Sequence, residues 1–159
     1  MFRRALLLAG LMITLAGGLT AATGSGTAIA ATPAPACTTS AIIEIAHFAF
    51  NPPAVAPGQS STGTMTALNC TDQPQQTSEI WSGRFVGPGV GIPPGCPAID
   101  PIAFAVNFSP HGTVSTSVGY LVPLTCTATQ LVVTADIHGK NGVLLAQGTA
   151  ILNIVAAAG

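Results

Sequence analysis

Residues 102–108 read Ile-Ala-Phe-Ala-Val-Asn-Phe, with a large apolar side chain at every second position. This alternation creates one apolar face and one face of alanine and asparagine, which is typical of a half-buried antiparallel strand. The same two-residue period returns further along the chain in residues 113–122 and 129–137. No window shows the period of a long helix, so the sequence predicts an all-β protein.

The strand pattern extends outward in both directions from these segments. Seven strands are predicted in total, at residues 41–50, 60–69, 76–86, 102–108, 113–122, 129–137 and 143–155. Most connections contain Gly or Pro, and Asn141-Gly142 is a strong turn signal before the last strand. Seven short strands within about 115 residues predict an antiparallel β-sandwich.

The first predicted strand changes its apolar phase in the middle. Ile43 and Ile45 share one phase, whereas Phe48 and Phe50 share the other. A strand that keeps one apolar face through such a change needs one extra residue. We therefore expect a β-bulge near Ala46-His47.

The N-terminal thirty residues have the pattern of a secretory signal peptide. Arg3-Arg4 precedes an apolar stretch, and Ala28-Ile29-Ala30 is a small-residue cleavage site. The apolar stretch is too short and too interrupted by Gly for a stable membrane span. We expect bacterial export, by the general secretory or the twin-arginine route. The protein is then secreted, with association with the cell envelope as an alternative. Residues 31–40 are expected to form an extended tether, and 41–156 a single β-sandwich domain.

Charged residues are scarce, at 6% of the chain against about 25% in typical proteins. Beyond residue 30 there are two basic and five acidic residues, a net charge of 2 − 5 = −3. They are Arg84 and Lys140 against Glu44, Asp72, Glu79, Asp100 and Asp136. This balance excludes a basic nucleic-acid footprint and a polybasic membrane patch, and no membrane span is expected after signal cleavage.

All four cysteines lie beyond the signal peptide, at Cys37, Cys70, Cys96 and Cys126. An even number in an exported domain indicates two disulfides. If the strands alternate up and down, Cys37 and Cys70 lie at one end of the sandwich and Cys96 and Cys126 at the other. Because bridged Cα atoms lie within about 7 Å, we expect the pairs Cys37–Cys70 and Cys96–Cys126.

No catalytic, metal or cofactor site is predicted. His47, His111 and His138 lie more than five residues from one another and from every cysteine, unlike the local pairs of common metal sites. There is no G-x-S-x-G motif, and the five acidic residues are scattered. We expect a protein that is not an enzyme, with a hydrolase as a remote alternative.

The segment 87–100 is the longest connection without a strand pattern and the best candidate for a contact surface. It carries Val90 and Ile92 between glycines and prolines and contains Cys96. Loops of this length are often functional; the other interpretation is a spacer held by the disulfide. Trp81 shares a strand face with Phe85, so core packing is favoured over an exposed carbohydrate platform.

Two resemblances carry expectations about function. The stretch from Phe50 to Gln59, with the Thr-rich strand that ends Leu68-Asn69-Cys70-Thr71, resembles the first hairpin of small secreted bacterial immunoglobulin-like domains of the adhesion type. Residues 112–117 are similar to a segment of neocarzinostatin-type apoproteins, which bind small chromophores in a secreted sandwich with two disulfides. In that family each disulfide closes a short loop, whereas successive cysteines here are 33, 26 and 30 residues apart.

The sequence therefore predicts a secreted binding or envelope-associated interaction module, with a protein or cell-surface partner. The contact would use the 87–100 loop or the Thr-rich face of residues 60–70. The alternative is a small-ligand carrier, which requires an apolar recess of about 300 Å³ or more. The oligomeric state is left open.

Overall fold

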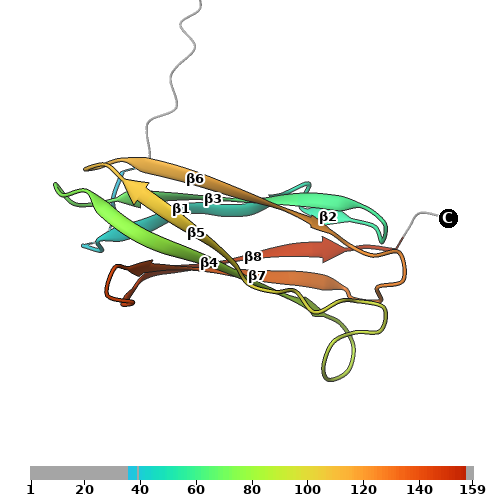
Figure 1. Ribbon diagram of the computed structural model, residues 1–159. Helices are drawn as coiled ribbons and strands as arrows, with labels where there is room; N and C mark the ends of the chain where they lie inside the picture. The colour runs from blue at the N-terminus through green and yellow to red at the C-terminus, as the bar shows by residue number, and fades with distance from the viewer. Residues whose placement is uncertain (1–35, 39, 157–159) are drawn as a thin grey trace, which may run out of the picture. The chain divides into compact units, whose positions relative to one another are not determined.

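A computed structural model describes residues 36–38 and 40–156 of the chain, and within them every regular element is a β-strand. The strands are β1 (Ile43–Asn51), β2 (Ala54–Val55), β3 (Ser60–Asn69), β4 (Gln75–Val86), β5 (Ile102–Phe108), β6 (Thr113–Leu121), β7 (Gln130–Gly139) and β8 (Leu144–Ile154). Figure 1 shows their arrangement. Seven of the eight coincide with predicted strands to within about two residues at each end, which is the usual uncertainty of strand bounds.

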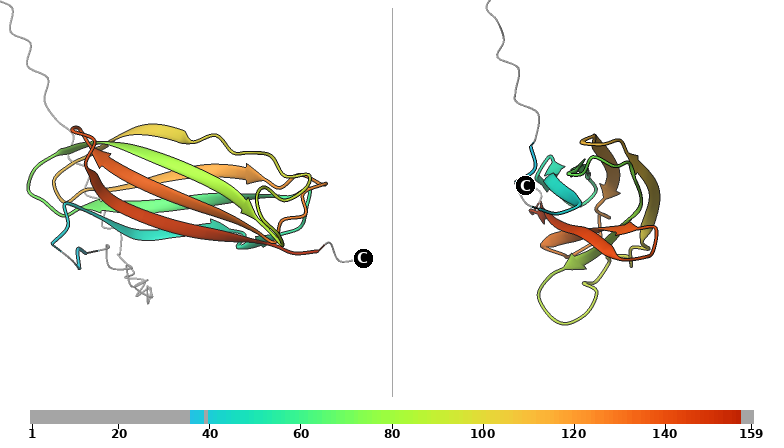
Figure 2. Two further views of the ribbon diagram at one scale, coloured as in Figure 1. Left: turned by 90° about the horizontal axis from the view of Figure 1, so that it is seen from below. Right: turned by 90° about the vertical axis from the view of Figure 1, so that its left-hand side faces the viewer.

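The strands form two sheets that pack face to face. One sheet has three strands in the order β1-β3-β6, and the other has five in the order β2-β8-β7-β4-β5. All pairings are antiparallel except β2 with β8, which is parallel. Figure 2 shows the two layers from below and end-on. The all-β, immunoglobulin-like sandwich predicted from the sequence is confirmed.

The described part of the chain has eight strands, one short strand more than the seven located in the sequence. The additional strand, β2, consists only of Ala54 and Val55, which pair with Asn153 and Ile154. Two residues cannot display a two-residue period, and they lie between Pro53 and Pro57. Ala54 and Val55 are extended because they pair with β8, which lies far away in the sequence. Residues 54 and 55 alone therefore show no strand pattern.

The bulge expected in the first strand is present. The register between β1 and β3 shifts between Ile45 and His47, which leaves Ala46 as the extra residue. Ile43 is buried before the shift and Phe50 after it. A second irregularity, between Ile137 and His138 opposite the start of β8, was not predicted.

Both disulfides have the predicted pairing and lie at opposite ends of the sandwich. Cys37 and Cys70 have Cα atoms 5.8 Å apart at the end where β1 begins and β3 ends, which we call the first pole. Cys96 and Cys126 have Cα atoms 4.4 Å apart at the end where β4 ends and β7 begins, which we call the second pole. In Figure 1 the first pole is on the left and the second on the right.

The core fills the space between the sheets with the inward side chains of alternating strands. Trp81 is 1% exposed, and its ring makes an edge contact with Phe48 at a centroid distance of 4.9 Å. The predicted inward positions of 129–137 are all fully buried: Leu131, Val133, Ala135 and Ile137. Burying this apolar surface supplies the main driving force for folding.

Tyr120 is the only tyrosine, and the pKa of its phenol depends on how deeply it is buried in this core. It is 7% exposed and makes an edge contact with Phe50. Burial raises the pKa of Tyr120 from 10.0 to about 12, because the phenolate loses its hydration. In the unfolded chain the phenol ionises near its ordinary pKa of about 10.

We therefore expect the contribution of the neutral Tyr120 phenol to be fully present below pH 10, and stability to fall by up to about 2 kcal/mol between pH 10 and pH 12, where the phenol ionises in the unfolded chain but not in the folded one. Urea unfolding across this range, with an ultraviolet titration of the phenolate, measures both effects. Tyr120→Phe should lack the loss that is due to the phenol. A folded-state titration midpoint near pH 10 would contradict the expected burial.

The predicted signal peptide, residues 1–30, lies outside the described residues, as does most of the predicted tether, of which 36–38 and 40 are described. The end of that tether is attached to the domain. Cys37 is bridged to Cys70, and Thr38 donates two hydrogen bonds to the Glu44 carboxylate, at 2.9 and 2.6 Å. Among the described residues no helix is long and apolar enough to cross a membrane.

Candidate functional site

The predicted contact loop, residues 87–100, is held firmly over most of its length. Cys96 is bridged to Cys126, and the Thr127 amide donates to the Pro94 carbonyl at 3.0 Å. Gly95 lies so close to the connection between β6 and β7 that a Cβ there would be 1.9 Å from the Thr125 carbonyl oxygen, and its φ is +72°. Only glycine fits this position without strain.

The two ends of the loop also pack against the sandwich. Pro93 packs over Gly87, where an added Cβ would lie 3.1 Å from the proline ring. Ile99 packs over Gly83 at the same distance and joins the edge of the core. This leaves a short projecting piece, residues 88–92, which we call the loop tip. It hangs from the side of the five-stranded sheet in Figure 1.

The loop tip presents two apolar side chains to solvent. Val90 is fully exposed and Ile92 is 59% exposed. Between the tip and the end of β4 lies a groove of about 460 Å³, lined by Arg84, Phe85, Val86, Gly87, Gly89, Val90, Gly91 and Ile92. Arg84 forms no ion pair with any described residue. The groove thus combines apolar side chains with one available cation.

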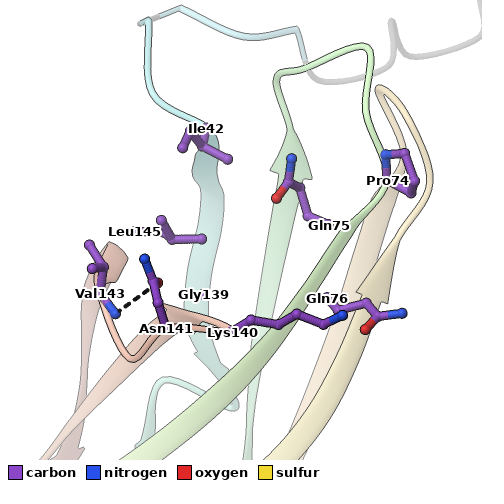
Figure 3. A pocket seen from close by; sticks show the side chains of 9 residues that line it. All are labelled: Ile42, Pro74, Gln75, Gln76, Gly139, Lys140, Asn141, Val143 and Leu145. Atoms are coloured by element: carbon purple, nitrogen blue, oxygen red, sulfur yellow. Dashed lines mark hydrogen bonds between the residues drawn. The ribbon is translucent and has the colours of Figure 1, made fainter.

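A larger recess, of about 690 Å³, opens at the first pole (Figure 3). Its lining comes from four separate pieces of the chain: the residue before β1, the start of β4, the β7–β8 turn and the start of β8. The residues are Ile42, Pro74, Gln75, Gln76, Gly139, Lys140, Asn141, Val143 and Leu145. Figure 3 shows Ile42 and Leu145 on one side of the space, Gln75 opposite, and Lys140 extending along the rim towards Gln76.

A buried asparagine holds one wall of this recess. Asn69 is 0% exposed; its Nδ2 donates to the carbonyls of Gln73 and Ser109 at 2.7 and 2.9 Å. Its Oδ1 accepts the amide and hydroxyl protons of Thr71, and Gln75 Nε2 donates to that hydroxyl oxygen at 3.1 Å. The network fixes the 70–74 turn, so Pro74 and Gln75 are held in place at the recess.

The opposite wall is the β7–β8 turn that Asn141-Gly142 predicted. Gly142 has a φ of +76°, and its amide donates to the Gly139 carbonyl at 2.9 Å. The Gly139 amide donates to the Val143 carbonyl, also at 2.9 Å. Asn141 Oδ1 accepts the Val143 amide at 3.3 Å. The turn carries Lys140, for which the described residues provide no ion-pair partner.

The structure does not bring the three histidines together. His47 is exposed at the β1 bulge, and the Nδ1 atom of His138 is buried without a hydrogen-bond partner among the described residues. His111 Nε2 lies 2.7 Å from Asp72 Oδ1, with both side chains well exposed. Sequence reasoning missed this pair because 39 residues separate its members. In the described part of the chain no three His, Cys, Asp or Glu residues are grouped as metal ligands would be.

Glu79 is the polar residue that sequence reasoning overlooked. It is 1% exposed between the sheets, and its Oε1 accepts hydrogen bonds from Trp81 Nε1 and, at 2.5 Å, from Thr116 Oγ1. Its position could have been found, because residue 79 shares the inward phase of Trp81 and Phe85. Trp81 itself is in the core, as predicted, and provides no carbohydrate platform.

Comparison with known proteins supports the fold alone. No protein-family model matches the sequence, and no curated protein matches it either. The alkylpurine DNA glycosylase AlkC of Pseudomonas fluorescens, solved bound to DNA containing an abasic site analog, matches at 17% identity with a TM-score of 0.52; the match covers 74% of this chain and 32% of that one. A cycloisomaltooligosaccharide glucanotransferase of a Paenibacillus species matches at 12% identity with a TM-score of 0.51, over 72% of this chain and 14% of that one.

A PapD-like domain of human CEP192 matches at 13% identity with a TM-score of 0.45, over 82% of this chain and 97% of that domain. The chain thus spans about a third of the glycosylase and a seventh of the glucanotransferase. At these identities, similarity of fold does not carry an activity across. A functional proposal must therefore rest on the loop tip with its groove and on the first-pole recess.

Proposed function

We propose that this protein is an exported binding module that contacts a partner protein through its loop tip, residues 88–92, and acts without catalysis. The observation that carries this proposal is the fully exposed Val90 side chain on a loop whose remaining length is tied down. Holding the loop in advance reduces the entropy lost on binding. The immunoglobulin-like sandwich fits a binding module, and the two disulfides are typical of proteins outside the reducing cytoplasm.

The chemistry of the loop tip indicates the kind of surface that it fits. Val90 and Ile92 suit a shallow apolar depression, and the groove behind them places Arg84 within reach of the same partner. The complementary surface would therefore carry an apolar hollow beside a carboxylate. Apolar contact supplies affinity and the charge pair favours one orientation.

The double substitution Val90→Ser with Ile92→Ser tests this proposal. We expect capture of the partner from envelope extract to weaken by about tenfold or more. Two aliphatic side chains that become buried against the partner on binding are lost, and that loss costs at least as much binding free energy. The unfolding free energy should stay unchanged, since both side chains are exposed in the free protein. The matched control is Leu144→Ser with Ile151→Ser, two exposed apolar residues of β8 that line neither site. Equal capture by both double variants would refute the role of the loop tip.

A second candidate function, small-ligand carriage, is favoured by the first-pole recess. Its volume of about 690 Å³ lies within the range of roughly 300–1,000 Å³ that is usual for ligand sites. The middle of the sandwich is filled by core side chains, so a ligand would enter the pole and not the interior. This function requires saturable binding of a small apolar probe, weakened by Leu145→Ser in the recess lining.

A further inference from the structure

We propose that the first-pole recess binds a small amphipathic anion, with its charged group on the Lys140 ammonium and its apolar body against Ile42, Val143 and Leu145. This inference rests on the second candidate function and names its ligand class. The occupant follows from the lining, which combines three aliphatic side chains and a proline with one cation, three carboxamides and no carboxylate.

The charge pattern of the whole domain makes Lys140 distinctive. Beyond residue 30 the chain has a net charge of −3 and only two cations, Lys140 and Arg84. Arg84 lies towards the opposite end of β4, eight residues beyond Gln76. Arg84 and Gln76 are therefore roughly 25 Å apart along the strand. The first-pole recess is therefore a place where an anion meets a cation without a competing carboxylate in the lining.

Two carboxamide side chains of the recess, Asn141 and Gln76, are near enough to Lys140 in the lining to contact the same ligand. Asn141 uses its Oδ1 to accept the Val143 amide, and Figure 3 shows its Nδ2 on the side of the recess. Gln76 lies beside the end of the Lys140 side chain in the same view. An anion bound there would receive one charged and up to two neutral hydrogen bonds, and charge-assisted hydrogen bonds are the stronger kind.

Lys140 also borders a second hollow, of about 310 Å³, on the outer face of the five-stranded sheet. That hollow is lined by Gln76, Thr77, Ser78, Ala105, Asn107, Gly139 and Lys140. Ala105 is the one apolar residue in that lining, so the hollow offers little contact to an apolar body. The aliphatic lining of the first-pole recess selects that space as the binding site.

Two fluorescent probes separate charge from apolar contact: anilinonaphthalene sulfonate, which is anionic, and phenylnaphthylamine, which has the same rings without the sulfonate. We expect the wild-type protein to bind the anionic probe about tenfold more tightly than the neutral one. Lys140→Gln should remove that tenfold preference, about 1.4 kcal/mol, and leave neutral-probe binding within about twofold. Leu145→Ser should weaken both probes. Arg84→Gln, which removes the other cation, should change neither.

The outcomes distinguish this inference from the function on which it rests. Equal binding of both probes to the wild-type protein, with weakening by Leu145→Ser, would overturn anion selectivity and keep small-ligand carriage. Equal losses in Lys140→Gln and Arg84→Gln would show a general charge effect and overturn the assigned site. Failure of both probes to bind would overturn the inference and the carrier function together. Thermal unfolding of each variant confirms that the comparison is made between folded proteins.

Discussion

Trp81→Ala should destabilise the domain by about 3–5 kcal/mol, the usual cost of truncating a buried tryptophan. The side chain is 1% exposed; its ring contacts Phe48 and lies where a Cβ on Gly63 would be 3.3 Å away. It also donates to the buried Glu79 carboxylate, which would lose that donor. Since small domains are stable by about 5–15 kcal/mol in total, much of the protein should be unfolded in mild urea.

Urea unfolding followed by far-ultraviolet circular dichroism measures this loss, because the chain has no other tryptophan for fluorescence. Trp81→Phe separates the two contributions: it keeps an aromatic ring but removes the donor to Glu79, at an expected cost of about 1–3 kcal/mol. Ser82→Ala, an outward-facing neighbour, is the control and should stay within about 0.5 kcal/mol of wild type. A loss below about 1 kcal/mol in Trp81→Ala would be incompatible with the packing described.

The second large effect concerns the Cys96–Cys126 disulfide, which closes a separation of 30 residues. Replacing both cysteines by serine should cost about 3–4 kcal/mol, because the unfolded chain regains the entropy that the link removes. The same change should weaken partner capture, since the link holds the base of the loop. Unfolding under non-reducing conditions measures the first effect and capture from envelope extract measures the second.

Replacing Cys37 and Cys70 is the matched control, since that link closes a similar separation of 33 residues. It should cost a similar free energy and leave capture through the loop tip unchanged. Equal loss of capture in both variants would mean that stability, and not the loop, determines binding. A cost below about 1 kcal/mol for Cys96 and Cys126 would contradict the chain-entropy account.

Much of the fold could be predicted because the residue patterns that identify most strands lie within each strand itself. The alternation of residues 102–108 identifies a strand without reference to any partner, and the phase change around Ala46 identifies a bulge in the same way. The disulfide pairing followed once the strands were placed, because each connection falls at a definite pole. β2 could not be predicted, since Ala54 and Val55 become a strand only through their pairing with β8.

The candidate sites were predictable to different degrees. The contact loop was visible as a long connection with Val90 and Ile92, although the sequence could not show that only the tip projects. Sequence reasoning allowed for a recess but could not locate it, because its lining comes from segments that meet only after folding, from Ile42 to Leu145. The Asp72–His111 pair was missed for the same reason.

Photo-crosslinking from position 90 tests the central claim, contact through the loop tip, most directly. A photoreactive residue at Val90 should give one discrete crosslinked partner in the cell envelope. The same residue at Ile151, which is 49% exposed on β8, should not give that product, and excess unlabelled wild-type protein should compete the product away. The same products from both positions, or none from position 90, would contradict the account.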